Sequence, residues 1–445
     1  MDIPIVRFVT EYEESGISRF HMPGHKGKNR LGFECRDITE IHGADVLYSP
    51  DGIIEESENN VSSLFGTAHS FYSTEGSSLC IRAMLAIALS GKKSPKILAA
   101  RNVHKAFVYA CALLDVSVEW IFPDCFTHPA DCLITPEKVK ESLENCSPLP
   151  DAVYVTSPNY LGRICDIEDI AKVCHAFGVP LLVDNAHGAY LAFTEEKNHP
   201  IALGADMCCD SAHKTLPVIT GGAYLHVSKN ADEKYLNIAR EKLELFASTS
   251  PSYLILQSLD LCNSYLDTKF PEELRACIEK LDAIKDAARS LGVVCLDGEK
   301  LKLVIDICES GLTKDSVLDA FSRNSVESEL CDEEFAVIMA SPDNTDEDLI
   351  RLLSAISELS YHRSAKESKK SNVFVLPEKV MSIRNAIFAS HEKIPTKNSV
   401  GRICADCTVS CPPAVPIVVC GEKIDEDTKN MLIKYGIDEI SVVAE

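Results

Sequence analysis

The chain has 445 residues, of which 46% are hydrophobic and 25% are charged, and 67 acidic against 44 basic residues give it a formal net charge of −23 at pH 7. This composition excludes collagen-like, low-complexity and disordered chains, and no apolar run approaches the roughly 18 residues that a membrane-spanning helix needs. Because so acidic a surface repels phosphate backbones, we do not expect nucleic acid among the partners. Since no apolar run is long enough to span a membrane, we do not expect a membrane among them either.

The N-terminal residues Met1 to Arg7 lack the charged and then apolar pattern of a secretory signal peptide. The 19 cysteines are an odd number and are scattered along the chain, which argues against a disulfide framework. We therefore expect a cytoplasmic protein whose cysteines are reduced. Cys404 and Cys407 have the spacing of half a zinc site, but no second pair of cysteines or histidines follows, so we predict no metal.

Between about residue 60 and residue 230, short β-like runs alternate with helical segments. The expected strands are Lys96–Ala100, Val116–Phe122, Ala152–Thr156, Val179–Asp184 and Gly222–Val227, and the expected helices are Leu79–Ala88, a segment from His104, and Asp166–Phe177. Such alternation predicts an α/β fold with a mostly parallel sheet covered on both faces. In sheets of this kind, ligands bind beyond the carboxyl ends of the strands.

The patterns in the rest of the chain predict smaller α+β domains. A helical stretch over Ala231–Leu245 is followed by a strand over Leu301–Ile307, helices over Lys314–Arg323 and Asp346–Leu359, a linker over Ser360–Ser371, and a helix from Asp425. We therefore predict an N-terminal arm over residues 1–50, a large domain over 51–285, a small α+β domain over 286–362 and a C-terminal domain over 363–445.

The large domain contains a lysine and an aspartate whose positions match the requirements of a particular cofactor. Asp184 ends the apolar run Val179–Asp184, so we expect it at the carboxyl edge of the sheet. Lys214 follows about thirty residues later, in the loop Asp210–Thr215 between apolar strands. Pyridoxal 5′-phosphate (PLP) needs such a pair, because a lysine forms a Schiff base with it and a carboxylate keeps its pyridine nitrogen protonated.

A phosphate-binding loop is also expected. Ser73–Ser78 precedes an apolar helical segment, and Gly76 permits a close backbone approach, while Ser77 and Ser78 add hydroxyl groups to the first-turn amides. Ser211 and His213 are further candidate phosphate donors. Glu75 interrupts the loop, and we expect its side chain to point away from the phosphate.

The sequence resembles the Orn/Lys/Arg decarboxylase family of PLP enzymes over most of its length. The segments that carry the resemblance are Arg19-Phe20-His21-Met22-Pro23-Gly24-His25-Lys26-Gly27, Asp37–Glu40, Pro50–Ile54, Leu64–Gly66, Arg101-Asn102-Val103-His104-Lys105, Thr156–Tyr160, Ser211-Ala212-His213-Lys214-Thr215-Leu216-Pro217, Val400–Ile403 and Gly421-Glu422. The resemblance implies the aspartate aminotransferase-like fold (fold type I), with the PLP-binding large domain and a C-terminal domain of the decarboxylase type.

The resemblance also implies roles for single residues. Lys214 is the Schiff-base lysine, Asp184 the partner of the pyridine nitrogen, and His104 the ring that stacks on the cofactor. Gly76, Ser77, Ser78, Ser211 and His213 hold the phosphate. The loop Thr249-Ser250-Pro251 resembles a segment that reaches the neighbouring subunit's site, which implies a homodimer with shared active sites and makes Ser250 a candidate substrate-binding residue.

Two further residues leave alternatives open. His187 lies where the family places an aromatic residue or a histidine near the cofactor, although a helix-capping or packing histidine would give the same pattern. Glu422 is a candidate anion for the distal cation of a basic substrate, and the alternative is a solvated glutamate that caps a helix.

The sequence departs from the family at Asn185, where a glutamate is usual, at Glu75, and at Cys411 and Ala414 in the segment before Val415. We predict a PLP-dependent decarboxylase of a basic amino acid, with arginine ahead of lysine and ornithine. Polyamine biosynthesis is the expected purpose, and acid consumption is the alternative that the sequence leaves open. The alternatives are an aminotransferase or lyase on the same fold, which needs the same lysine and aspartate, and a non-catalytic paralogue.

Overall fold

A computed structural model describes residues 1–123, 128–363, 377–409 and 415–445. Two of the departures noted above, Cys411 and Ala414, lie outside the described residues. The chain divides into two compact units. The first contains residues 1–98, 139–157 and 166–271, and the second contains residues 99–138, 158–165 and 272–445. The domain boundaries expected from the sequence stay a prediction.

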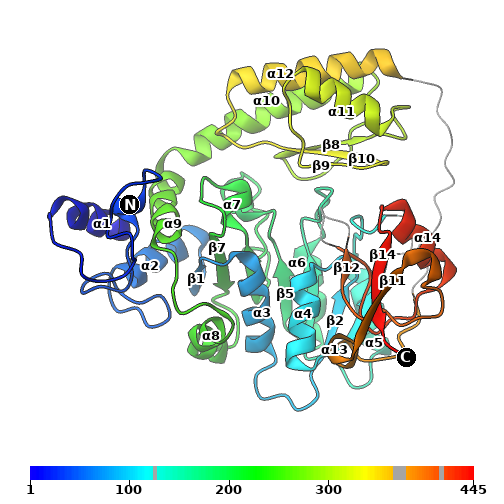
Figure 1. Ribbon diagram of the computed structural model, residues 1–445, viewed down its shortest axis with the longest axis horizontal. Helices are drawn as coiled ribbons and strands as arrows, with labels where there is room; N and C mark the ends of the chain where they lie inside the picture. Colours follow the sequence, from blue (N-terminus) through cyan, green and yellow to red (C-terminus); the bar gives the residue numbers. More distant parts are fainter. Residues whose placement is uncertain (124–127, 364–376, 410–414) are drawn as a thin grey trace. The chain divides into compact units, whose positions relative to one another are not determined.

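The central sheet has seven strands in the order β1-β7-β6-β5-β4-β2-β3 (Figure 1). The strands are β1 (His69–Ser73), β2 (Lys96–Ala100), β3 (Ser117–Ile121), β4 (Ala152–Thr156), β5 (Leu181–Asp184), β6 (Met207–Asp210) and β7 (Ala223–Val227). β5 pairs in parallel with β4 and β6, whereas β7 pairs antiparallel with both β6 and β1. This sheet confirms the predicted α/β fold with a mostly parallel sheet.

Helices separate the strands in chain order. They are α1 (Pro4–Glu14), α2 (Ile53–Phe65), α3 (Gly76–Ala88), α4 (Lys105–Leu114), α5 (Pro136–Asn145), α6 (Ile167–Ala176), α7 (Ala212–Thr215), α8 (Glu233–Phe246), α9 (Tyr253–Thr268) and α10 (Phe270–Ser290), with the 3₁₀ turns η1 (Glu34–Arg36) and η2 (Ala189–Phe193). α3 is apolar almost throughout and packs against β6 and β7 and against α8. A helix buried on several sides needs such a sequence, because it has no solvent-facing stripe.

The second unit holds three smaller sheets. β8 (Lys302–Asp306), β10 (Phe335–Met339) and β9 (Leu330–Cys331) form an antiparallel sheet with α11 (Lys314–Arg323) and α12 (Asp346–Leu359), which η3 (Ser360–His362) follows. The C-terminal part contains α13 (Ile383–Phe388), β11 (His391–Pro395), η4 (Thr396–Asn398), β12 (Thr408–Val409), β13 (Pro416–Val418), α14 (Glu426–Lys434) and β14 (Glu439–Val443). β11 pairs with β14 and β12 pairs antiparallel with β13, and a core of Cys404, Ile417, Val418, Ile424, Leu432, Ile440 and Val442 lies in this part.

The predicted elements agree with the structure except at their ends. Several helices, the strands of the smaller sheets other than β8, and two strands of the central sheet were not named from the sequence. The linker expected over Ser360–Ser371 begins with η3, and its residues 364–371 lie outside the described residues. α11 and α12 have the bounds expected from the sequence, as do β2 and β4. β1 and β6 were not expected, because β1 has the sequence His-Ser-Phe-Tyr-Ser and β6 has Met-Cys-Cys-Asp. Both are short and lack the β-branched residues that mark a strand. β6 is a fully buried strand between β5 and β7, and β1 is an edge strand that pairs with β7, so pairing within the sheet makes both of them strands.

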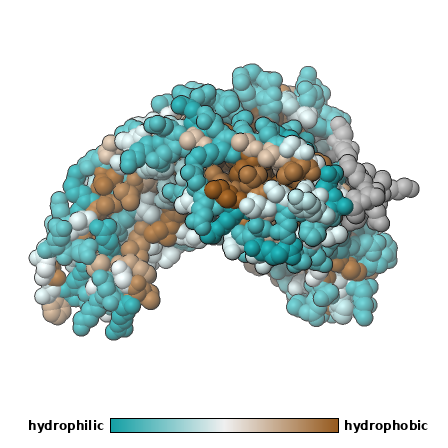
Figure 2. All heavy atoms as spheres, turned by 90° about the horizontal axis from the view of Figure 1, so that it is seen from above, coloured by the Kyte–Doolittle hydropathy of each residue, from teal (hydrophilic) through white to brown (hydrophobic). Residues whose placement is uncertain are grey.

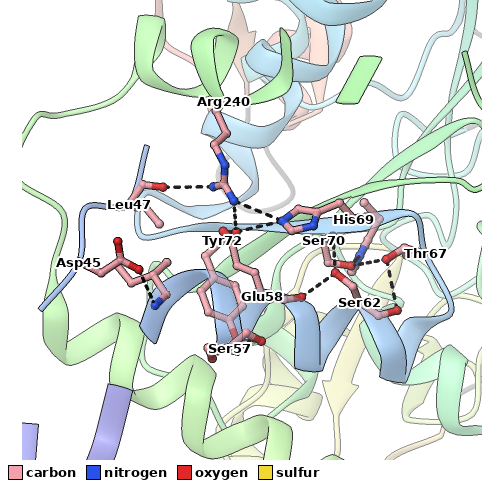
Figure 3. A network of polar contacts seen from close by, with 12 residues as sticks. Asp45, Leu47, Ser57, Glu58, Ser62, Thr67, His69, Ser70, Tyr72 and Arg240 are labelled. Carbon is pink, nitrogen blue, oxygen red and sulfur yellow. Dashed lines mark hydrogen bonds and ion pairs between the residues drawn. The ribbon is translucent and has the colours of Figure 1, made fainter. Parts of the chain in front are cut away.

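A buried carboxylate, Glu58, joins three elements of the first unit (Figure 3). It accepts hydrogen bonds from Tyr72 N at 2.8 Å, His69 Nε2 at 3.0 Å and Arg240 Nη2 at 2.6 Å. Glu58 lies on α2, His69 and Tyr72 on β1, and Arg240 on α8. Because each partner removes part of the cost of burying the charge, the network fixes the edge strand β1 against the two helices.

The surface is mainly hydrophilic, but hydrophobic residues gather in patches on the face shown in Figure 2. Among the described residues, no helix has both the length and the apolar character needed to cross a membrane.

The N-terminal helix α1 is capped by a residue far away in the sequence. Its N-cap residue, Ile3, offers no side-chain acceptor, and Asp260 of α9 instead accepts Val6 N at 2.9 Å and Ser57 Oγ at 2.6 Å. Burial raises the pKa of Asp260 to about 6 in spite of these hydrogen bonds. The carboxyl group therefore binds α1 at the first-turn amides, where an acceptor is required.

We predict that Asp260 makes stability depend on pH. Its folded pKa, about 6, is above the value of 3.8 expected for an exposed carboxyl, so its contribution is fully present below about pH 3.8 and is lost as the pH rises through about 6. Asp260→Asn removes this dependence, and the melting temperature of the variant relative to wild type should rise between pH 4.5 and pH 7.5. Circular dichroism melts check this. Asn263→Ala, a buried residue on the same helix, should give a difference that does not change with pH, and a constant difference for Asp260→Asn would contradict the prediction.

Candidate active site

Asp184 ends β5 and is almost completely buried, with 2% of its surface exposed. Its carboxylate accepts hydrogen bonds from Ala186 N and Tyr154 Oη, both at 3.2 Å, and lies 3.7 Å from Cys209 Sγ. Tyr154 and Cys209 belong to the neighbouring strands β4 and β6, so the parallel register sets the environment of this carboxylate.

Burial raises the pKa of Asp184, and the nearby positive charge of Lys214 opposes the rise without cancelling it. A carboxylate in this state gains stability from a further hydrogen-bonded cation. Thr156 Oγ1, on the register partner of Asp184, is buried without a hydrogen-bond partner among the described residues.

Lys214 lies on the short helix α7, which follows β6 directly after Ser211. The residue is solvent-exposed, and its Nζ is 3.0 Å from His187 Nε2. His187 follows β5 by three residues and is 6% exposed. The ends of β5 and β6 therefore bring Asp184, His187 and Lys214 together, as the sequence predicts for the carboxyl edge of the sheet.

His213 precedes Lys214 and has a fixed orientation. Its Nδ1 donates to Gly222 O at 2.9 Å. Burial lowers the pKa of His213, and the hydrogen bond to Gly222 opposes this shift. The neutral ring in this tautomer presents Nε2 as an acceptor, so His213 binds a phosphate only when it takes up a proton.

The loop between β1 and α3 has the properties of an anion site. Gly76 has a φ of +70°, and a Cβ atom there would meet no atom within 4 Å, so the space beside the backbone is open. Ser211 Oγ donates to Ser77 Oγ at 2.7 Å, which places both hydroxyls at the first turn of α3 together with the amides of Ser77 and Ser78. Amides of a first helical turn have no partner within the helix and attract anions.

Glu75 is held away from these groups by its own hydrogen bond, because its carboxylate accepts Ser248 N at 2.7 Å. This agrees with the expectation that Glu75 points away from the phosphate. The bond also ties the exposed segment that contains Ser250 to the N-terminus of α3, since Ser250 N donates to Ser248 Oγ at 3.2 Å.

The two remaining predicted residues belong to the second unit. His104 is the N-cap of α4, and its Nδ1 accepts Ala106 N at 3.1 Å. Glu422 is 3% exposed, lies 3.2 Å from Arg101 Nη2 and accepts Val419 N at 2.7 Å. The alternative of a solvated, helix-capping glutamate is therefore wrong for Glu422, while its role toward a substrate stays a prediction, as does the stacking role of His104.

Sequence reasoning missed Tyr154 and Cys209, which both contact Asp184. Tyr154 lies two residues before the end of the predicted strand Ala152–Thr156. Side chains two residues apart on a strand share a face. That alternation was the only feature of the sequence that indicated a position for Tyr154 near the end of the strand. No feature indicated Cys209, because β6 itself was not expected.

The residues present fit PLP. The buried carboxylate of Asp184 matches a protonated ring nitrogen, Lys214 is an accessible amine, and the open space beside Gly76 lies at an anion-binding helix terminus. All of these residues lie in the first unit.

Comparisons with known proteins point to one enzyme family. The family model described as Orn/Lys/Arg decarboxylase, major domain, matches residues 3–308, and the model described as Orn/Lys/Arg decarboxylase, C-terminal domain, matches residues 366–435. The chain is 30% identical to arginine decarboxylase of Bacillus subtilis (strain 168), over 94% of this chain and 90% of that protein. It is 29% identical to arginine decarboxylase of Halalkalibacterium halodurans, over 95% of this chain and 91% of that protein.

Among solved structures, the fold is similar to that of the Francisella novicida lysine decarboxylase LdcF, with a TM-score of 0.81 and 18% sequence identity. The match covers 99% of this chain and 81% of that one.

We predict that Asp184→Asn stabilises the ligand-free protein at neutral pH. The folded pKa of Asp184 is raised, so its contribution is present below the unfolded pKa and is lost as the pH rises through the folded value. Above that window wild type carries a buried charge that the amide avoids. The melting temperature of the ligand-free variant should therefore exceed that of wild type at pH 8 and lose this advantage at pH 4. The reverse pH trend would contradict the prediction.

Proposed function

The chain belongs to the Orn/Lys/Arg decarboxylase family of PLP-dependent enzymes, and we propose that it decarboxylates arginine to CO₂ and the corresponding amine. The observation that carries the choice of substrate is the extent of the alignments. Relatives named arginine decarboxylase align over 94% and 95% of this chain, whereas the lysine decarboxylase LdcA of Pseudomonas aeruginosa aligns over 59% of it.

The chemistry divides between the cofactor and the chain. When bound, PLP accepts the electron pair that a departing carboxylate leaves on Cα. We propose that Lys214 holds the cofactor through its amine and that Asp184 binds the protonated ring nitrogen. Gly76, Ser77, Ser78 and Ser211 would bind the phosphate, since the hydroxyls of Ser77 and Ser211 lie together at the first turn of α3, whose amides are further donors.

The proton transfers are assigned to two histidines. His187 Nε2 is 3.0 Å from Lys214 Nζ, so it is placed to take a proton from this ammonium group and return it. His213, whose pKa burial lowers, offers Nε2 as a second acceptor beside Lys214. His104 is proposed to stack on the cofactor ring, and Ser250 and Glu422 remain candidates for contact with the substrate.

We also propose a homodimer. Large hydrophobic side chains of the N-terminal arm are exposed: Phe20 is 94%, Leu31 is 77% and Met22 is 69% exposed. Exposed apolar side chains that gather in one segment mark an interface. A second copy of the chain is the proposed partner, because the segment around Ser250 resembles one that reaches a neighbouring active site.

The proposed compartment is the cytoplasm and the proposed pathway is polyamine biosynthesis. The cysteines of the described residues are in the thiol form, which a reducing compartment favours. The product of arginine decarboxylation keeps the guanidinium group and ends in a primary amine, because a proton replaces the carboxylate on Cα. It is therefore a polyamine precursor in chemical class.

We predict that the purified protein with PLP shows the visible absorbance of bound cofactor and releases CO₂ from arginine faster than from lysine or ornithine. Lys214→Ala should abolish the protein-bound absorbance and activity. Asp184→Asn should lower kcat by about 10²-fold or more, because the ring nitrogen loses its anionic partner. Release of a keto acid without CO₂ would favour an aminotransferase or another lyase, and wild type without the absorbance would favour a non-catalytic paralogue.

We predict that Phe20→Ser with Leu31→Ser halves the molecular mass measured by sedimentation velocity. The two substitutions place hydroxyl groups in the proposed apolar interface, which then no longer excludes water. Ile350→Ser on α12, where the side chain is 63% exposed, is the matched control and should leave the mass unchanged. A wild-type protein that sediments as a monomer would contradict the proposed homodimer.

A further inference from the structure

A buried polar cluster lies behind the proposed active site, on the other face of the sheet. It consists of Asn185, His199, Asp210 and His226, which are at most 1% exposed. Asp184 and Cys209 are register partners whose side chains contact each other. Because side chains alternate along a strand, Asp210 points to the opposite face. We call these four residues the rear cluster.

Hydrogen bonds to Asp210 hold the rear cluster together. Asn185 Nδ2 donates to Asp210 Oδ1 at 2.7 Å. His199 Nε2 and His226 Nε2 donate to Asp210 Oδ2 at 3.0 and 3.2 Å. His226 Nδ1 lies 2.7 Å from Ser70 Oγ on β1, so the bonds reach from β5 across β6 and β7 to the edge strand.

The electrostatics favour an ionised Asp210. Burial alone would raise the pKa of Asp210, but the two histidines more than offset this and hold its pKa well below the ordinary value. Burial lowers the pKa of His226. A buried carboxylate with three donors in place makes strong, charge-assisted hydrogen bonds, and these resist displacement of the donors.

The rear cluster is joined to the active site through the chain itself. Asn185 follows Asp184, and Asp210 precedes Ser211 in the segment that leads to Lys214. The backbone ladder between β5 and β6 ends with the bond from Asn185 N to Cys209 O at 3.0 Å. Beyond this point, the Asn185–Asp210 side-chain bond is the next tie between the two strand ends.

We propose that Asn185 and Asp210 are positioning residues, whose hydrogen bond fixes the end of β5 against the end of β6 and so sets Asp184 relative to Lys214. The inference rests on the proposed roles of Asp184 and Lys214 in binding PLP. It assigns a function to Asn185, at which the sequence departs from the family.

The test exchanges the amide of Asn185 and the carboxylate of Asp210. Asn185→Asp alone places two carboxylates in contact and should weaken PLP binding by about tenfold or more. It should also shift the visible absorbance of the bound cofactor and lower kcat, with little change in KM for arginine. Adding Asp210→Asn restores an amide–carboxylate pair in the reversed order, so the double variant should recover cofactor affinity and absorbance toward wild type.

Asn263→Ala is the matched control. Asn263 is a fully buried amide of the same unit that donates to Tyr72 Oη at 2.7 Å and to Ser57 O at 3.1 Å, outside the rear cluster. Its loss should lower the melting temperature while PLP affinity and the visible absorbance stay as in wild type. If Asn185→Asp behaves in the same way, the rear cluster only stabilises the fold and the proposal is overturned, as it is if the double variant recovers nothing.

Two further results would also overturn the proposal, and each can be distinguished from the outcomes described above. His199, Cys208 and Asp210 carry ligand-type atoms that all lie within 4.8 Å of one another, so one equivalent of zinc in the purified protein would replace the hydrogen-bonded arrangement by a metal site. A wild-type protein that fails to bind PLP would overturn the proposed function and this inference with it, and it is recognised because the failure precedes any substitution.

Discussion

The burial of Asp184 is the constraint on which the active-site half of the structure depends. A carboxylate loses its hydration at this depth, and its environment offers a tyrosine hydroxyl, a thiol and one amide in return. The tyrosine hydroxyl and the thiol are held by the parallel register of β4, β5 and β6, so a slip of one residue in either neighbouring strand would remove them. The amide of Ala186 belongs to the segment directly after Asp184. Burying this carboxylate destabilises the folded protein, and a cation bound beside it would offset that cost.

The proposed phosphate-binding loop depends on a different constraint, the close approach of two backbone segments. Gly76 N donates to Gly221 O at 2.7 Å, which joins the start of α3 to the turn before β7. Gly221 has a φ of +104°, and a Cβ atom there would lie 2.9 Å from Thr74 O. Both facts require glycine at this position. The antiparallel pairing of β1 with β7 thus places the anion site, as the parallel half of the sheet places the carboxylate and the lysine.

The sequence predicted the parts of the site that have local signals. Asp184 ends an apolar run, and Lys214 lies within a motif, so both were found together with the fold class. The residues that surround Asp184 were not predicted, because only the register of the strands brings them together. Tyr154 and Cys209 lie on separate strands, and the strand that carries Cys209 has no β-branched residue. The burial of Glu422 beside Arg101 likewise follows from a contact across 321 positions of the chain, which no local pattern reports.

Asn185 shows how a departure from the family pattern can be consistent with an intact site. The glutamate that the resemblance to the family implies at this position would add a second carboxylate to a cluster in which Asp210 already carries the charge. Two like charges at hydrogen-bond distance in a buried setting repel strongly. With Asn185 the same contact is a hydrogen bond of 2.7 Å. In the proposed arrangement the amide at 185 and the acid at 210 depend on each other, so the departure at Asn185 is compatible with a well-supported Asp184.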